Sequence, residues 1–150
     1  MATNYNGQTL DVHEGCTRFK VKGSIAASID DIAVLSGGYL TKGSAAANLK
    51  FVGTFAEDVD TTGASDGDEF GDYLGPQVNS PLDRRLYWFE NGDTGDAFAQ
   101  TDMGKKAYID GARAVTKTST TRSLLGTAIR LSADAAYVQV SPEPLGVNGL

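Results

Sequence analysis

The residues able to do nucleophilic or acid–base chemistry are few in this sequence. His13 is the only histidine, and no cysteine or serine stands near it at the spacing of a catalytic motif. Nucleophilic catalysis needs a base beside the nucleophile, so we interpret His13 as a surface residue. Carboxylates are plentiful, but nothing in the sequence singles out a pair of the kind a hydrolase uses. We therefore expect no catalytic residues and no enzymatic activity, and keep a small hydrolase as a remote alternative.

Cys16 is the only cysteine, so no disulfide bond can form within the chain. A lone cysteine is most often a small packed side chain rather than a reactive thiol. We interpret Cys16 in this way and expect synthesis in a reducing cytoplasm.

An acidic stretch after residue 56 could offer oxygen ligands to calcium. Its carboxylates belong to Asp58, Asp60, Asp66, Asp68, Glu69 and Asp72. The segment "DVDTTGASDGDE" lacks the ligand order of a helix–loop–helix calcium site, in which a bidentate glutamate closes the loop. We expect these carboxylates to be solvated and no metal to be bound. Because no glycine-rich phosphate loop is present either, we expect no cofactor.

Charge and composition exclude several classes of partner. The 150 residues carry a formal net charge of −6, whereas nucleic-acid binding depends on neutralising phosphates. No window approaches the ~20 apolar residues of a membrane span, and the start lacks a signal-peptide pattern. We expect a soluble protein with no nucleic-acid or membrane partner. The length favours one domain over residues 1–150, and 18 glycines favour many turns over long helices.

Short segments with period-two alternation predict β-strands along most of the chain. The expected strands cover residues 17–25, 32–35, 39–40, 49–55, 86–89, 107–109, 115–118, 125–131 and 137–140. A helical turn capped by Ser28 is the alternative for residues 28–35. A short helical turn is expected at 101–103, ended by Gly104. Residues 107–129, "AYIDGARAVTKTSTTRSLLGTAI", have the pattern of a β-hairpin around a threonine-rich bend.

The remaining segments complete the predicted architecture. Residues 125–131 place four side chains on one face expected to be core, namely Leu125, Thr127, Ile129 and Leu131. Residues 1–9 and 141–150 are interpreted as flexible arms, the second because its prolines do not fit a central strand. Residues 56–85 are interpreted as a long loop. The predicted fold is all-β, a compact β-barrel or sandwich of short antiparallel strands with a long acidic loop and flexible terminal arms.

The most apolar aromatic run is "LYWF" at residues 86–89, which contains Trp88. Core packing is the ordinary interpretation of such a run. Tryptophan and tyrosine are also favoured at interfaces, so an anchor for a partner is the alternative.

The order of features from residue 86 to residue 140 resembles the capsid decoration, or cement, proteins of tailed bacteriophages and prophages. In that family a "GDA…TQAD-hydrophobe-GK-x-x-Y" stretch precedes "D…VTKT", a "G-x-A" strand and a final "VxV" strand. The matching pieces here are Gly95 to Ala97, Thr101 to Lys105, Tyr108, Asp110, Val115 to Thr118, Gly126 to Ala128 and Val138 to Val140. The long segment 56–85 departs from the shorter members of the family.

The resemblance implies a compact β fold without catalysis that binds the outside of an assembled icosahedral shell. The implied partner is the major capsid protein, the implied state is a trimer, and the implied location is the virion surface. Another virion part, such as a head-fibre base or a tail protein, is the alternative. The side chains expected to contact a partner are Tyr5, Leu10, Trp88, Pro142, Leu145 and Leu150.

Overall fold

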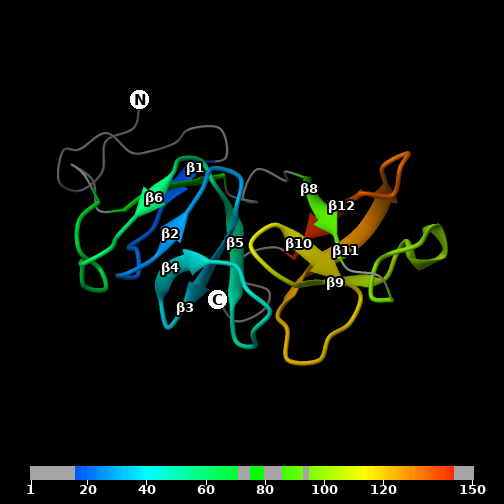
Figure 1. The fold of residues 1–150 in the computed structure, drawn as a ribbon, viewed down its shortest axis with the longest axis horizontal. Helices are drawn as coiled ribbons and strands as arrows, with labels where there is room; N and C mark the ends of the chain where they lie inside the picture. The colour runs from blue at the N-terminus through cyan, green and yellow to red at the C-terminus, as the bar shows by residue number, and fades with distance from the viewer. Residues whose placement is uncertain (1–15, 71–74, 80–85, 93–94, 144–150) are drawn as a thin grey trace.

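The computed structural model describes residues 16–70, 75–79, 86–92 and 95–143. The regular structure in these ranges is β, apart from one 3₁₀ turn, η2 (Gln100–Asp102). Strands up to residue 79 form a sheet and a two-stranded ribbon on the left of Figure 1, and later strands form a closed barrel on the right. The prediction of an all-β fold is therefore confirmed. The predicted helical turn before Gly104 is also confirmed, as η2.

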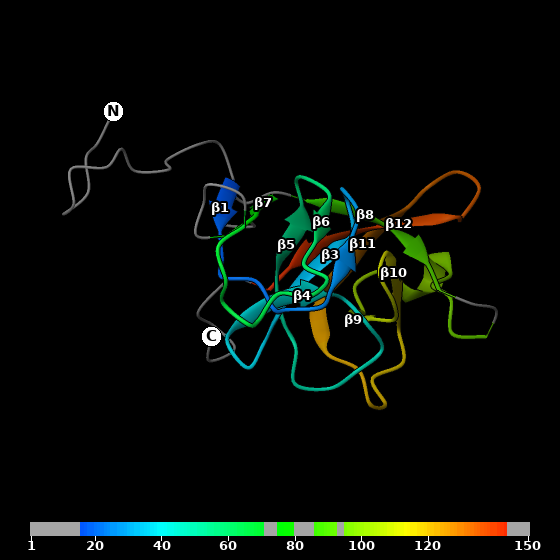
Figure 2. The same ribbon diagram turned by 60° about the vertical axis from the view of Figure 1, so that its left-hand side comes forward.

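The first unit is a five-stranded antiparallel sheet. In spatial order its strands are β1 (Cys16–Arg18), β7 (Gln77–Asn79), β5 (Lys50–Phe55), β3 (Ile32–Ser36) and β4 (Tyr39–Lys42). Figure 2 shows β1 beside β7 at one edge of the sheet. Gly37 and Gly38, with φ of 58° and 90°, join β3 to β4 in the left-handed backbone that a tight hairpin needs.

The helical alternative at residues 28–35 is wrong. The carbonyl of Ser28 accepts a hydrogen bond from the amide of Asp31 at 3.0 Å, and this closes a turn that leads straight into β3. The next residues are apolar and partly β-branched, and they pair with strands on both sides. Pairing along two neighbours outweighs the weak helix preference of the segment.

The sheet is buried on both faces, so three layers stack in the molecule. One face packs against the barrel and contributes Ile32, Val34 and Phe51 to a shared core. The other face contributes Ala33, Val52, Phe55 and Val78 to a second core. That core is covered by a ribbon of β2 (Ala26–Ala27) and β6 (Val59–Asp60). Burial on both faces explains why β5 is buried from Phe51 to Phe55 without alternation.

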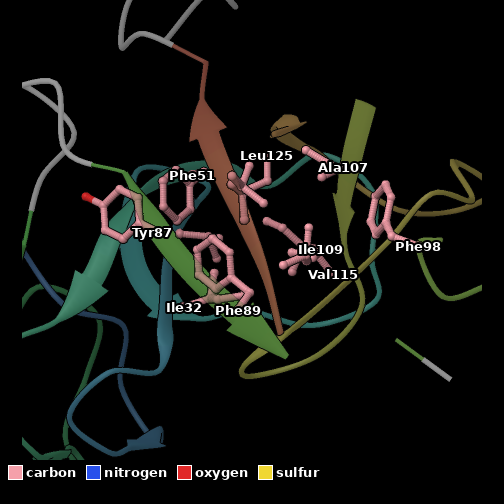
Figure 3. Close-up of a cluster of buried hydrophobic side chains, with 13 residues drawn as sticks. Ile32, Phe51, Tyr87, Phe89, Phe98, Ala107, Ile109, Val115 and Leu125 are labelled. Carbon is pink, nitrogen blue, oxygen red and sulfur yellow. The ribbon is translucent and has the colours of Figure 1, made fainter. Parts of the chain in front are cut away.

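The second unit is a barrel with the strand order β10-β8-β12-β11-β9, closed by pairing of β9 with β10. Its strands are β8 (Tyr87–Asn91), β9 (Lys106–Ile109), β10 (Ala114–Thr116), β11 (Leu124–Leu131) and β12 (Tyr137–Pro142). The β10–β8 pair is parallel and the other pairs are antiparallel. Figure 3 shows its interior, where rings from β8 meet Phe51 of the sheet.

The hairpin predicted around the threonine-rich bend is wrong, because the strands on either side of that bend are not neighbours. β9 lies between β10 and β11 and pairs with both of them. The bend instead crosses over β9 and is held by Asp96. The hydroxyl of Thr116 donates to the Asp96 carbonyl at 2.8 Å, and that of Thr118 donates to the Asp96 carboxylate at 2.8 Å.

The predicted core face of β11 is correct for Leu125 and wrong for Ile129. Leu125 is fully buried, whereas Ile129 is 41% exposed. Ala128 pairs with Val140 and Arg130 with Gln139, so Ile129 is an extra residue on β11. Such a β-bulge resets the alternation of a strand. A second shift, between Leu124 and Gly126 in the pairing with β9, lets both Leu125 and Ala128 lie in the core, so that Ile129, next to Ala128, faces outward.

The predicted loop 56–85 and arm 141–150 also need correction. The segment 56–85 contains β6 and β7, which are too short for alternation to be visible in the sequence. β12 reaches Pro142, which pairs with Gly126. The proline is tolerated because the pairing of β12 with β8 ends at Val140, so β8 does not need the amide hydrogen that Pro142 lacks. Residues 1–9 and 144–150 lie outside the described residues.

Candidate docking surface

The outer face of β8 and β12 carries large apolar side chains that the core does not cover. Tyr87 and Phe89 point into the barrel, so the alternating positions point out. Leu86 is 47%, Trp88 44% and Tyr137 48% exposed. The register pairs Trp88 with Gln139 and Glu90 with Tyr137, which places Trp88 and Tyr137 in two adjacent rows across the face. Clustered exposed aromatic side chains are typical of a surface that binds another molecule.

Arg130 of β11 extends this face by one strand. It pairs with Gln139, which in turn pairs with Trp88, so the three side chains follow one row across the sheet. The guanidinium carbon of Arg130 lies 5.3 Å from the centre of the Trp88 ring system. A cation over an aromatic face is attracted to it, so Arg130 packs favourably on the indole of Trp88.

A groove of about 380 Å³ adjoins the aromatic face, between β8 of the barrel and the ends of β5 and β7. The barrel side is lined by Leu86, Tyr87, Trp88, Phe89, Glu90, Arg113 and Tyr137. The other side is lined by Asp30, Thr54 and Asn79. We call the groove together with the aromatic face of Leu86, Trp88 and Tyr137 the barrel groove.

The floor of the barrel groove is rigid. The hydroxyl of Tyr87 donates a hydrogen bond to the carbonyl of Asn79 at 2.6 Å. The Tyr87 ring meets Phe51 edge to face at 5.3 Å and stacks on Phe89 at 5.8 Å between centroids. These contacts belong to the shared core of the sheet and the barrel, so the floor is held by both units (Figure 3).

Arg113 joins the two sides of the barrel groove. Its Nε donates to the buried Asp31 carboxylate at 2.7 Å, and its NH2 group donates to the Ile29 carbonyl at 3.0 Å. The hydrogen bond to Asp31 raises the pKa of Arg113, with smaller contributions from the negative charges of Asp30 and Glu90. Arg113 is thus a charged clamp between the turn before β3 and the barrel.

A second polar cluster surrounds Asp102 and does not line the barrel groove. The buried Asp102 carboxylate accepts hydrogen bonds from the amide of Ala99 at 2.8 Å, Lys105 Nζ at 2.8 Å and Lys117 Nζ at 2.9 Å. The bond from Lys105, then the Ala99 amide and Lys117, hold the pKa of Asp102 well below its ordinary value. The cluster ties η2 to the strand that ends at Thr116, which is a structural role.

The carboxylates of the acidic segment mostly hold backbone turns. Asp58 accepts from the amide of Ile29, Asp66 from Gly23, and Asp68 from Ser65, all at 2.8–2.9 Å. Asp60 accepts from the amide and the hydroxyl of Thr62, and these bonds lower the pKa of Asp60. In the part of the chain that the structure describes, no group of three or more histidine, cysteine, aspartate or glutamate side chains is arranged to hold a metal.

Two of the predicted contact residues fall within the described residues. Trp88 is on the exposed face, where the sequence left core packing as the first interpretation, and Pro142 is at the end of β12. Tyr5, Leu10, Leu145 and Leu150 lie outside the described residues, as does His13.

Leu86, Tyr137 and Arg113 line the barrel groove but were not predicted from the sequence as contact residues. Tyr137 could have been found, because the alternation in "AAYVQV" sets it opposite Val138. Arg113 gave no signal, since its partner Asp31 lies far away in the sequence.

Comparisons with protein families, with curated proteins and with solved structures found no match for this chain. Among the described residues, no helix has the length and apolar character needed to cross a membrane.

Proposed function

We propose that this protein is a virion structural protein that binds the outside of an assembled phage capsid and stabilises it. The proposal starts from the sequence resemblance to capsid decoration proteins. The observation that supports it best is the barrel groove, in which Leu86, Trp88 and Tyr137 are all more than two-fifths exposed on one face. Exposed aromatic side chains of this kind act as anchors in protein–protein interfaces.

The architecture suits binding rather than movement. The floor of the barrel groove is built from rings that belong to the core, so the face is pre-organised and little conformational entropy is lost on docking. We further propose that the protein acts as a trimer, because several copies of a modest contact bind a shell far more tightly than one copy does.

The proposal can be tested by adding the purified protein to bare capsids and measuring occupancy. Trp88→Ala removes the central anchor, and we expect occupancy at limiting protein to fall by about tenfold or more, the usual effect of losing an interface hot spot. Ile129→Ala is the matched control, because Ile129 is similarly exposed on β11 but does not line the groove. Circular dichroism checks that both variants fold.

Counting copies in purified virions separates the proposed role from its alternatives. A number in proportion to the coat protein supports decoration, whereas a handful of copies per particle indicates a head-fibre base or a tail component. Full occupancy by the Trp88 variant would contradict a contact through the barrel groove. Absence from virions would contradict a structural role altogether.

A further inference from the structure

The barrel groove carries negatively charged side chains as well as apolar ones. Asp30 and Glu90 line it, and the buried Asp31 lies directly behind Arg113. Three carboxylates therefore surround one guanidinium. Asp30 and Glu90 are exposed, and among the described residues neither carboxylate makes a hydrogen bond or an ion pair. They are close enough to Arg113 to contribute to the rise of its pKa.

The cations near the groove are already engaged. Arg113 donates to Asp31 and to the Ile29 carbonyl, and Arg130 lies over the Trp88 ring. An anionic ligand could reach the remaining N–H groups of Arg113 but would meet the carboxylates of Asp30 and Glu90. A cationic ligand would meet two carboxylates that have no partner among the described residues.

The net charge of the whole chain also favours a basic partner. A second copy of this protein would bring a net charge of −6 to a face that is itself negative. Like charges brought together at an interface are costly, and complementary charges set the choice of partner. The favoured occupant is therefore a basic segment of a different protein.

We propose that the barrel groove binds an extended protein segment in which an arginine or lysine stands next to an apolar residue. The cation lies between Asp30 and Glu90, and the apolar side chain packs on Trp88, Tyr137 and Leu86. This inference rests on the proposed function in that it assigns such a segment to the coat protein. It adds the chemistry by which the groove selects its partner.

Trp88 makes the test direct, because it is the only tryptophan in the sequence and its fluorescence reports on the groove without a label. The probes are two short blocked peptides of alternating leucine and arginine, or leucine and glutamate. We expect the arginine peptide to shift the Trp88 emission in a saturable way and the glutamate peptide to have no effect. Raising the ionic strength should weaken the arginine complex, because exposed charges are screened by salt.

Single charge removals test the two carboxylates. Glu90→Gln should weaken binding of the arginine peptide by about three- to fivefold, as for an exposed charge pair. Glu69→Gln is the matched control, since Glu69 is an exposed glutamate that does not line the groove. Asp30 has φ of 74°, a conformation that asparagine also tolerates, so Asp30→Asn should leave the backbone conformation unchanged. The double variant Asp30→Asn/Glu90→Gln should weaken binding by about tenfold or more.

The outcomes separate this inference from the proposed function. Equal binding of both peptides, or equal loss in the Glu90 and Glu69 variants, overturns the basic-segment inference. A change of oligomeric state in the Trp88→Ala variant overturns it as well, because the groove would then join copies of this chain. If capsid occupancy depends on Trp88 but not on Asp30 and Glu90, the proposed function stands and the inference fails. If the arginine peptide binds selectively and capsids do not, the inference stands and the proposed function fails.

Discussion

Replacing Leu125 by alanine removes a side chain that is fully buried in the shared core of sheet and barrel. The substitution loses the transfer free energy of the removed carbons and leaves a cavity. We expect the free energy of unfolding to fall by about 3–5 kcal/mol, the range seen for buried leucines. For a chain of 150 residues this corresponds to a melting temperature lower by roughly 6–20 °C.

Replacing Ile129 by alanine removes a similar number of carbons from the same strand. A fully buried isoleucine would lose about 2.4 kcal/mol, at about 0.8 kcal/mol for each carbon. Ile129 is 41% exposed, and water fills the space left by the truncation, so no cavity is added. We expect a loss of about 1 kcal/mol or less, as for most surface substitutions.

Urea unfolding followed by far-ultraviolet circular dichroism measures both losses on one scale. The slope of the free energy with urea should be equal in the two variants, so that the midpoints can be compared directly. The predicted difference between the variants is about 2–4 kcal/mol. Equal losses, or a greater loss for Ile129, would refute the β-bulge between Ala128 and Arg130 and the register built on it.

Five other predictions each rest on a single feature. Gly53→Ala should destabilise by at least about 2 kcal/mol in a denaturant melt, because φ is 140° and the new carbon would lie 2.0 Å from the Asn79 carbonyl oxygen. Gly63→Ala, with φ of 81° and open space around it, should cost only about 1–2 kcal/mol. The lowered pKa of Asp102 stabilises the fold above the unfolded value of about 4 and is lost as the pH falls, so Asp102→Asn should flatten the acid limb of a stability–pH curve. A calcium chelator should leave the melting temperature unchanged, and a fall reversed by calcium would contradict the turn-holding role of the acidic segment. Removing residues 144–150 should preserve the fold and reduce capsid occupancy, whereas removing 141–150 also shortens β12 and should lower the melting temperature.

Local sequence determined the β character of the protein and several of its turns. The strand expected at residues 137–140 is confirmed as β12, where Val138 and Val140 are buried; the extra residue of the bulge lies on β11, so alternation within β12 is kept. The strands expected at 32–35 and 39–40 are confirmed as β3 and β4, and Gly37 and Gly38 between them take a left-handed backbone that a residue without a side chain adopts at no cost. These features depend on neighbours along the chain.

The candidate site was only partly visible in the sequence. Trp88 stood out by its residue type, but its exposure depends on which face of β8 meets Phe51. The clamp between Arg113 and Asp31 joins residues that are remote in the sequence. No local pattern distinguishes such a pair from two solvated charges.

Tertiary structure alone decided the register of β11, the position of Pro142 and the order of the barrel strands. Ile129 forms a bulge because β12 has no residue that pairs with it. Pro142 can lie within β12 because the pairing of β12 with β8 ends at Val140. The threonine-rich bend crosses over β9 rather than closing a hairpin, because β9 occupies the place beside both β10 and β11. In each case the outcome depends on hydrogen bonds and packing between strands, and alternation within one strand carries no information about its partner.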